Sequence, residues 1–384
     1  MTDRDENPSS THPPLPPTTE DDQFARLRLL RSRRVGVATY YRLLTEHGTA
    51  QNALAALPEV ARAAGVERYE ICPEAVIYAE LKAAKSAGAR LLVHGTAAYP
   101  SLLSDLADAP PFLWAIGDPA LMQRPMVSLV GARNASSLGT RMAKALARDL
   151  GAEGYVVVSG LARGVDAAAH LAALETGTVA VQAGGVDVMY PAENTELALS
   201  IAKSGLRLSE QPMGLQPMAR HFPSRNRIIS GLSRATVVVE AAAKSGSLIT
   251  ARDALDQGRD VLAVPGHPFD ARAAGCNMLI RDGATLVRSA RDVIEALAPL
   301  APAESAPQKP LPLPDAPPQK RRSLRDMAAL HRQILHRLGP SPVAEDQLIR
   351  DLAVAPAEVA PALVDLELDG QITRRAGGLL SSAD

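Results

Sequence analysis

The residues best suited to bind a ligand lie between His221 and Thr250. Phe222 begins a segment with several arginines, which leads into an apolar run and then into a loop rich in serine. No acidic residue lies between Glu210 and Glu240. A cationic segment attracts phosphates, and an aromatic ring within it can stack on a nucleic-acid base. The basic residues that give the segment its charge are Arg220, Arg225, Arg227 and Arg234.

Two other loops place an arginine among small residues, each between an expected strand and an expected helix. The first contains Gly131 and Arg133 and leads to a helix expected near Thr140. Free amides at a helix N-terminus favour an anion, so Arg133 is expected to point at a phosphate held there; the alternative is a surface arginine that caps a neighbouring helix. The glycine spacing lacks the G-x-G-x-x-G fingerprint, which disfavours NAD. The second loop contains Ser159, Gly160, Arg163 and Gly164.

A group of hydroxyl side chains follows a later apolar run. Ser245, Ser247 and Thr250, grouped around Gly246, lie where a phosphate would accept hydroxyl and amide hydrogen bonds. A simple helix cap is the alternative function of such a cluster. Glu240, at the end of the strand, has the chemistry either to fix this loop or to act as a general base.

Asp166 and His170 are four residues apart and therefore lie on one face of an expected helix. They have the chemistry of a base and its orienting acid, but no serine or cysteine nucleophile is tied to them by sequence. We interpret them as a structural pair that holds the preceding loop, and not as metal ligands. Asn194 has the type and position of an N-cap for a helix around 197–201.

Five apolar runs, separated by helical stretches, position these loops. The runs span 127–130, 155–158, 179–181, 235–239 and 261–264, and they are nearly continuous in apolar residues. Continuous runs are typical of strands that are covered on both faces. The pattern predicts the α/β class, with a Rossmann-like, doubly wound and mostly parallel sheet, in which ligands bind beyond the carboxyl ends of the strands.

Composition and periodicity divide the chain into six segments. Residues 1–22 combine prolines with acids and lack apolar periodicity, so a disordered tail is expected. The final segment has the pattern of a winged helix, three helices followed by a short hairpin. The helical module is either a packing element or a contact to the DNA backbone. After the tail, the segments are a helical (SAM/helix-hairpin-helix-like) module at 23–90, a connector at 91–124, the Rossmann-like domain at 125–298, a Pro-rich linker at 299–322 and the winged-helix domain at 323–384.

Overall composition limits the function classes. The formal net charge is −1, so any binding to nucleic acid must come from a local patch. Cys72 and Cys276 are far apart and lack ligand spacing, which argues against a disulfide framework and a cysteine-based zinc site. Charges interrupt the apolar runs well before the roughly 20 residues of a membrane span, and no signal pattern begins the chain. A cytoplasmic protein is expected.

Taken together, the motifs resemble the DNA-processing protein A family, also called DprA or Smf. The resemblance rests on residues 130–133, 159–166 with His170, 190–194, 222–229, 245–250 and 265–266, which occur in the family's order. The segment 99–117 and the terminal winged helix are similar to those of the longer members. The resemblance therefore extends over nearly the whole chain after the tail.

The resemblance implies a protein that binds single-stranded DNA entering the cell in natural transformation (competence), protects it, and loads the RecA recombinase onto it. It implies a homodimer formed through the Rossmann-like domain, and no catalysis. No cofactor or metal is expected. Arg133 and Arg163 are expected to contact phosphates, and Phe222 to stack on a base. The expected DNA-binding residues are Gly131, Arg133, Ser159, Gly160, Arg163, Gly164, Phe222, Arg225, Asn226, Arg227, Ser245, Gly246, Ser247 and Thr250.

Within the same resemblance, Arg225 and Arg227 are expected to line one groove, while Asn226 is expected to hold the loop. Two departures stand out: Ala132 replaces a frequent serine, which removes one hydroxyl ligand, and Ala183 replaces a glycine. Neither is expected to abolish binding, because the amides and arginines remain.

A different class of function stays open at this point. Related Rossmann-like domains place phosphates and ribose at the same strand ends, so an enzyme or sensor for a small nucleotide is the alternative, with Glu240 as its acid or base. A third possibility is that the winged helix alone binds duplex DNA. Because this domain carries acidic residues throughout, binding to a protein is at least as favourable an explanation for it as binding to duplex DNA.

Overall fold

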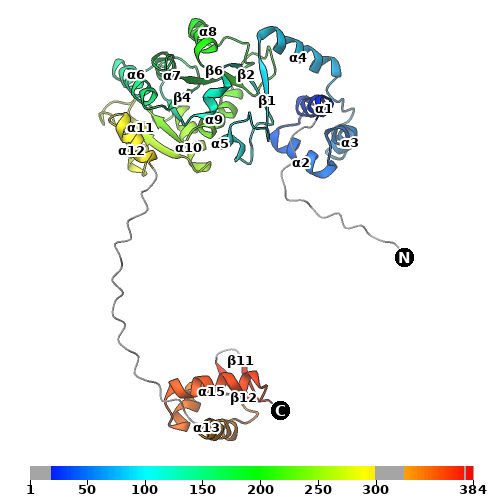
Figure 1. Cartoon of the computed structure of the whole chain (residues 1–384), viewed down its shortest axis with the longest axis vertical. Coiled ribbons are helices and arrows are strands. Elements are labelled where there is room, and N and C mark those ends of the chain that lie inside the picture. Colours follow the sequence, from blue (N-terminus) through cyan, green and yellow to red (C-terminus); the bar gives the residue numbers. More distant parts are fainter. Residues whose placement is uncertain (1–18, 299–323, 376–377, 384) are drawn as a thin grey trace. The chain divides into compact units, whose positions relative to one another are not determined.

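The computed structural model describes residues 19–298, 324–375 and 378–383 (Figure 1). The chain forms two compact units, Met1–Ala301 and Pro302–Asp384. The linker expected at 299–322 lies outside the described residues, as does most of the tail expected at 1–22. Within the described residues, no helix combines the length and the hydropathy that a membrane span requires.

The first unit begins with four helices. They are α1 (Glu20–Arg31), α2 (Val37–His47), α3 (Ala50–Ala63) and α4 (Glu74–Ala87). The tail was expected to extend to residue 22, but α1 already begins at Glu20. The Thr19 hydroxyl accepts a hydrogen bond from the Asp22 amide at 3.1 Å, and three acids in the first turn favour the helix dipole. The charges that suggested disorder therefore stabilise the start of a helix.

A nine-stranded sheet forms the centre of the first unit, in the order β1-β2-β6-β5-β4-β3-β7-β8-β9. Strands β3 to β9 run parallel to one another, whereas β2 runs antiparallel to both of its neighbours, β1 and β6. The mostly parallel, Rossmann-like sheet is confirmed. Its strands are β1 (Arg90–Val93), β2 (Phe112–Gly117), β3 (Met126–Val130), β4 (Val156–Ser159), β5 (Thr178–Val181), β6 (Leu206–Ser209), β7 (Ala235–Val238), β8 (Asp260–Ala263) and β9 (Thr285–Leu286).

The segment expected as a connector at 91–124 supplies the strands β1 and β2 and is therefore part of the sheet. Strand β2 pairs with β6, and β1 completes that edge. Apolar and polar residues do not alternate along β1 and β2, because one face of these strands packs against the core of the sheet and the other against the N-terminal helices. Leu113 packs in the core between the sheet and the helices on one of its faces, while Phe112 and Trp114 pack among the N-terminal helices.

Helices cover both faces of the sheet (Figure 1). Alternate strand residues point to opposite sides, so Val127 and Leu129 pack against α6, α7 and α12, whereas Val130 packs against the opposite layer. That layer contains α5, α9, α10 and α11. The helices are α5 (Ser101–Ser104), α6 (Ser137–Ala152), α7 (Val165–Ala172), α8 (Thr195–Ser204), α9 (His221–Leu232), α10 (Ser247–Asp256), α11 (Ala274–Arg281) and α12 (Ala290–Leu297).

The second unit has the three helices and the hairpin expected of a winged helix. Its own core includes Ile334, Leu363 and Leu380. A short strand before the second helix, which the sequence did not indicate, pairs with the hairpin. The elements are α13 (Leu324–Arg337), β10 (Val343–Ala344), α14 (Glu345–Leu352), α15 (Pro356–Leu368), β11 (Ile372–Arg375) and β12 (Leu379–Ser382).

Candidate nucleic-acid interface

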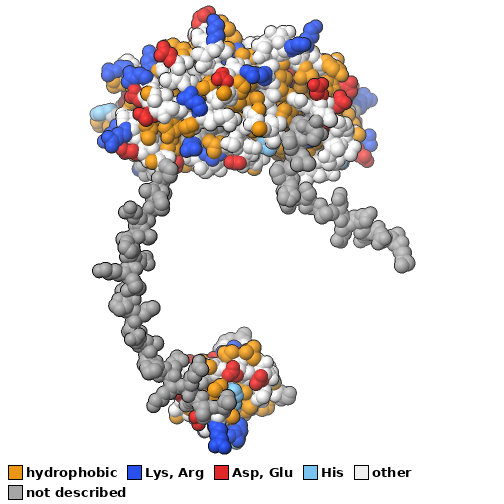
Figure 2. Space-filling view, in the orientation of Figure 1, with side chains coloured by type: hydrophobic (Ala, Val, Ile, Leu, Met, Phe, Trp, Pro, Cys, Tyr) orange, Lys and Arg blue, Asp and Glu red, His pale blue; other side chains and the backbone are white. Residues whose placement is uncertain are grey.

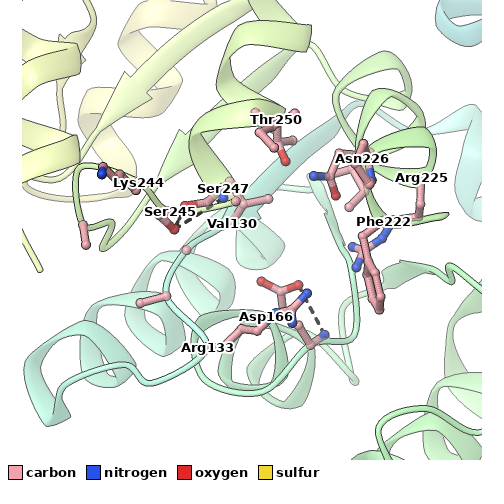
Figure 3. Close-up of a pocket in the computed structure, with 18 of the residues that line it drawn as sticks. Val130, Arg133, Asp166, Phe222, Arg225, Asn226, Lys244, Ser245, Ser247 and Thr250 are labelled. Atoms are coloured by element: carbon pink, nitrogen blue, oxygen red, sulfur yellow. Dashed lines mark hydrogen bonds between the residues drawn. The ribbon is translucent and has the colours of Figure 1, made fainter. Parts of the chain in front are cut away.

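Two adjoining cavities lie beyond the carboxyl ends of the parallel strands, where the fold places ligands. The large cavity has a volume of about 790 Å³ and is lined by the loops after β3 and β7 together with α9 (Figure 3). The small cavity, of about 340 Å³, lies against the loops after β4 and β5. Arg133, Phe222 and Arg225 line both cavities and so form the ridge between them.

Helix α9 supplies one wall of the large cavity. Phe222, Arg225, Asn226 and Ile229 have the spacing i, i+3, i+4 and i+7, which puts them on one helical face, and all four line the cavity. The segment was expected to form a loop that Asn226 holds. In the helix, the Asn226 side chain instead points into the cavity (Figure 3), and none of the described residues forms a hydrogen bond with its amide.

Phe222 lies within a group of cationic and aromatic side chains. The Arg133 guanidinium carbon is 5.0 Å from the centre of the Phe222 ring, and that of Arg225 is 5.9 Å away. The Tyr190 ring lies 5.9 Å from Phe222, tilted by 53°. Cations near an aromatic face hold the ring and leave charge for a ligand beside it. Phe222 is half-buried, so part of its ring remains available for stacking.

Arg225 is the most unusual charge of the site, because it is only 6% exposed. Burial lowers the pKa of Arg225 to about 10, and the nearby Asp166 carboxylate opposes this shift. Its guanidinium forms no hydrogen bond with the described residues, although it lines both cavities. The side chain stays protonated at neutral pH. A buried cation without a hydrogen-bonding partner is favourable only where an anion can reach it.

Gly160 makes room for this guanidinium. A Cβ atom at position 160 would lie 1.3 Å from Nη1 of Arg225, so only glycine fits there. The neighbouring loop is held by Asp166, whose carboxylate accepts hydrogen bonds from the amides of Gly160 and Ala162 at 3.1 and 3.3 Å. Gly160 thus acts by positioning Arg225 in addition to lining the small cavity.

His170, in its neutral form, also holds the loop after β4. The Thr178 hydroxyl donates to the carbonyl of Val157, so Nδ1–H of His170 donates to that hydroxyl at 2.7 Å. Its Nε2 accepts from the Leu161 amide at 3.3 Å. Burial, followed by the positive charge of Arg225, lowers the pKa of His170 to about 3. The interpretation of Asp166 and His170 as a structural pair is confirmed.

Asn194 is the N-cap residue of α8, as expected, but its side chain does not cap that helix and instead holds the loop after β4. Its amide nitrogen donates to the carbonyls of Leu161 and Ala162, at 2.9 and 3.1 Å. Leu161 has a φ of 55°, which is costly for a residue with a side chain. The loop therefore needs this support, and the Asn194 side chain bonds to the loop and not to the amides at the start of α8.

The anion position at the start of α6 is already occupied by a carboxylate of the protein. Helix α6 begins at Ser137, earlier than expected, and the buried Glu240 carboxylate accepts hydrogen bonds from the Ser136 amide at 3.0 Å and from its hydroxyl at 2.5 Å. Ser136 in turn accepts from the Gly139 amide at 2.9 Å. The carboxylate fills the anion position that the sequence assigned to a ligand. Glu240 was expected to fix the serine loop or to act as a general base; its carboxylate instead braces the loop before α6.

The start of α10 offers an alternative anion position on the opposite wall. Ser245, Ser247 and Thr250 line the large cavity together with Gly246 (Figure 3). The hydroxyls of Ser245 and Ser247 are 2.8 Å apart, and the Ser245 hydroxyl also accepts a hydrogen bond from the Ser247 amide at 3.4 Å. An anion here would meet the N-terminal end of the helix dipole.

Three comparisons with known proteins agree on the family. The model described as "DNA recombination-mediator protein A" matches residues 90–298, which is more than half of the chain. The chain belongs to the DprA family. Models described as the DprA-like N-terminal HHH domain and the DprA winged helix domain match residues 20–83 and 312–378.

Curated and solved members of the DprA family are similar over most of their length. The DNA processing protein DprA of Streptococcus pneumoniae is 46% identical over 198 residues, 51% of this chain and 70% of the relative. Protein Smf of Escherichia coli is 37% identical, over 73% of this chain and 74% of the relative. The solved S. pneumoniae structure has a TM-score of 0.56 at 36% identity, and covers 68% of this chain and 98% of its own.

Another solved structure concerns DNA directly. It is described as giving structural insights into the single-stranded DNA binding mode of DNA processing protein A from Helicobacter pylori. It has a TM-score of 0.51 at 30% identity and covers 54% of this chain and 95% of its own.

Three residues that the resemblance to the DprA family placed in the groove lie elsewhere. Arg227 faces away from both cavities and donates to the Glu210 carboxylate at 2.6 Å and to the Asp108 carbonyl at 2.7 Å. The Ser159 hydroxyl is buried and donates to a backbone carbonyl of β3 at 2.6 Å. Gly164 lines neither cavity; a Cβ there would lie 2.3 Å from the Ala132 carbonyl oxygen, so the glycine permits two loops to pack closely.

The sequence reasoning also missed residues that the structure brings into the site. Lys244 and Arg272 line the large cavity, and Tyr190 lines the small one. Lys244 directly precedes the serine loop, so its position was a usable signal, and no described residue pairs with its ammonium group. Arg272 is a long way along the chain and forms an ion pair with Asp270 at 3.1 Å, so only the fold could reveal it.

Proposed function

We propose that this DprA family member binds single-stranded DNA across the ridge between the two cavities. As a non-enzymatic recombination mediator, it protects DNA that enters the cell during natural transformation and loads RecA onto it. The observation that carries the proposal is Arg225, a buried cation with no hydrogen-bonding partner, beside the half-buried ring of Phe222. Single-strand binding needs this combination, since cations attract the backbone and an aromatic ring accepts any base.

The charges of the site suit a phosphate backbone. Arg133 and Lys244 form no ion pair with the described residues, and together with Arg225 they surround the large cavity. Figure 2 shows basic and acidic side chains interspersed over the visible face of the first unit. The attraction for DNA is therefore local, as the net charge of −1 requires. The H. pylori relative, whose structure is described as showing a single-stranded DNA binding mode, supports single-stranded DNA as the ligand.

A homodimer through the Rossmann-like domain is part of the proposal. The part of the chain from the end of β8 to β9 exposes large apolar side chains: Phe269 is 95% exposed, Leu286 41% and Met278 36%. Exposed apolar groups beside the edge strand β9 suit a protein contact. Size-exclusion chromatography with light scattering tests this, and a monomer at micromolar concentration would contradict it.

A small nucleotide remains the second candidate because the large cavity has the volume for one and the serine loop lies at a helix N-terminus. The acid suggested for such chemistry argues against catalysis. Glu240 is bound by the amide and hydroxyl of Ser136, and both oxygens are committed to bracing α6.

The test compares affinity for a fluorescent oligo-dT of about 20 nucleotides with that for a duplex and for mononucleotides. We expect the single strand to bind most tightly, and Arg133→Ala to lower the log-affinity versus log-salt slope by about 0.7. Arg234→Ala is the matched control, since Arg234 belongs to the same cationic segment but lines neither cavity. Tighter binding of a mononucleotide, or its turnover, would contradict the proposal.

A further inference from the structure

The small cavity has the groups of a second nucleotide subsite. Tyr190 lines it with 47% of its surface exposed, which is unusual in a chain with only 3% aromatic residues. The Tyr190 hydroxyl forms no hydrogen bond with the described residues. Its ring contacts Phe222, but about half of the side chain stays open to solvent beside the cavity, where a stacking ligand would cover it.

Tyr190 and Phe222 are arranged for successive bases. Their ring centres are 5.9 Å apart and their planes are tilted by 53°, so the rings do not stack on one another face to face. Phe222 lines both cavities, whereas Tyr190 lines the small one alone. A strand that crosses the ridge would place one base on Phe222 and bring a neighbouring base to Tyr190.

A cation accompanies this second aromatic ring. Arg163 lines the small cavity, and its side chain is 62% exposed. Its contact within the chain is a loose ion pair, 3.6 Å from the carboxylate of Glu193, whose side chain is 61% exposed. Such exposed pairs contribute little stability, so a DNA phosphate can replace the carboxylate at low cost. Glu193 then competes with DNA for Arg163.

We propose that the small cavity is a second nucleotide subsite, in which Tyr190 stacks on a base and Arg163 binds a phosphate in competition with Glu193. The inference rests on the proposed function, because it requires a single strand that crosses the ridge at Phe222. It extends the site from one stacked base to two. It also gives Glu193 the role of a residue that limits affinity.

The first test measures binding of the full chain to oligo-dT of about 20 nucleotides and to an abasic strand of the same length. We expect Tyr190→Ala to weaken dT binding by roughly 5- to 150-fold, the range for one stacked base, and to leave the abasic strand unchanged. Tyr190→Phe should keep the wild-type affinity. Tyr78→Ala is the control, as Tyr78 is an exposed tyrosine that lines neither cavity.

The second test is a gain of affinity, which a folding defect cannot imitate. We expect Glu193→Gln to strengthen binding by about two- to fivefold at low salt, since it frees Arg163. Glu196→Gln removes an equal charge three residues away, from a residue that lines neither cavity, and should have a smaller effect. If Tyr190→Ala and Glu193→Gln both bind like the wild type, the inference is wrong. If the wild type itself fails to bind oligo-dT, the proposed function fails first.

Discussion

Replacing Gly160 with alanine tests whether the buried guanidinium binds DNA. The new Cβ would lie 1.3 Å from Nη1 and 2.4 Å from Cζ of Arg225, so the two groups cannot coexist. Gly160 does not have a positive φ, which means that alanine is compatible with the backbone. The substitution therefore expels the guanidinium from its place without changing the net charge.

The size of the effect follows from what Arg225 contributes. A hydrogen bond between a guanidinium and a phosphate is worth about 1.5 to 3 kcal/mol, because one partner is charged. The dissociation constant for oligo-dT should rise roughly 10- to 150-fold. Because one phosphate contact is lost, the salt slope should fall by about 0.7. Arg225→Ala should have the same two effects.

Fluorescence anisotropy across a salt series measures both quantities, and urea denaturation measures stability. The variant that carries both Gly160→Ala and Arg225→Ala should bind no more weakly than either single variant, because each removes the same contact. It should also be more stable than Gly160→Ala alone, since shortening Arg225 removes the clash. Gly36→Ala, with no atom within 4 Å of the added Cβ, is the control. Wild-type affinity in Gly160→Ala, or additive losses in the double variant, would refute the reasoning.

Three further outcomes follow from the same geometry. Phe222→Ala should weaken oligo-dT binding by about 1 to 3 kcal/mol with an unchanged salt slope, and equal losses on an abasic strand would exclude stacking. Arg227→Ala should destabilise the fold by about 3 kcal/mol in urea, because it leaves the largely buried carboxylate of Glu210 without this partner. The salt slope should stay unchanged, and a changed slope would show that Arg227 contacts DNA. The pKa of His170 is near 3 when folded and near 6.5 when unfolded, so the unfolded state binds more protons between these values and stability falls as pH falls through this window. His170→Gln should flatten that part of the stability profile, and an unchanged profile would assign the acid sensitivity to other groups.

The sequence predicted the sheet well where both of its faces are covered. The five apolar runs became β3, β4, β5, β7 and β8, because parallel strands packed between two helical layers must be apolar throughout. The strands β1, β2, β6 and β9 were missed. Two of them share their faces between two cores, and β9 has only two residues, both of them exposed.

The site was predicted in its position and in part of its residues. Strand order placed the loops with Arg133 and the serines at one edge of the sheet, and Phe222 and Arg225 do line the cavities there. Arg227 was misplaced because the segment was treated as a loop. A helix turns by about 100° per residue, so Arg227, two residues after Arg225, lies on the opposite side of α9.

Residue types and spacing by themselves determined the fold class, the family, and a cationic site with one aromatic ring at the strand ends. Only the tertiary structure decided which charges are free. Glu240 lies at the start of α6 and occupies the anion position there, Arg227 is neutralised by Glu210, and Arg225 is buried over Gly160 without a hydrogen bond from the described residues. Pairing depends on contacts between residues distant in the chain, and composition and local periodicity carry no information about those distances.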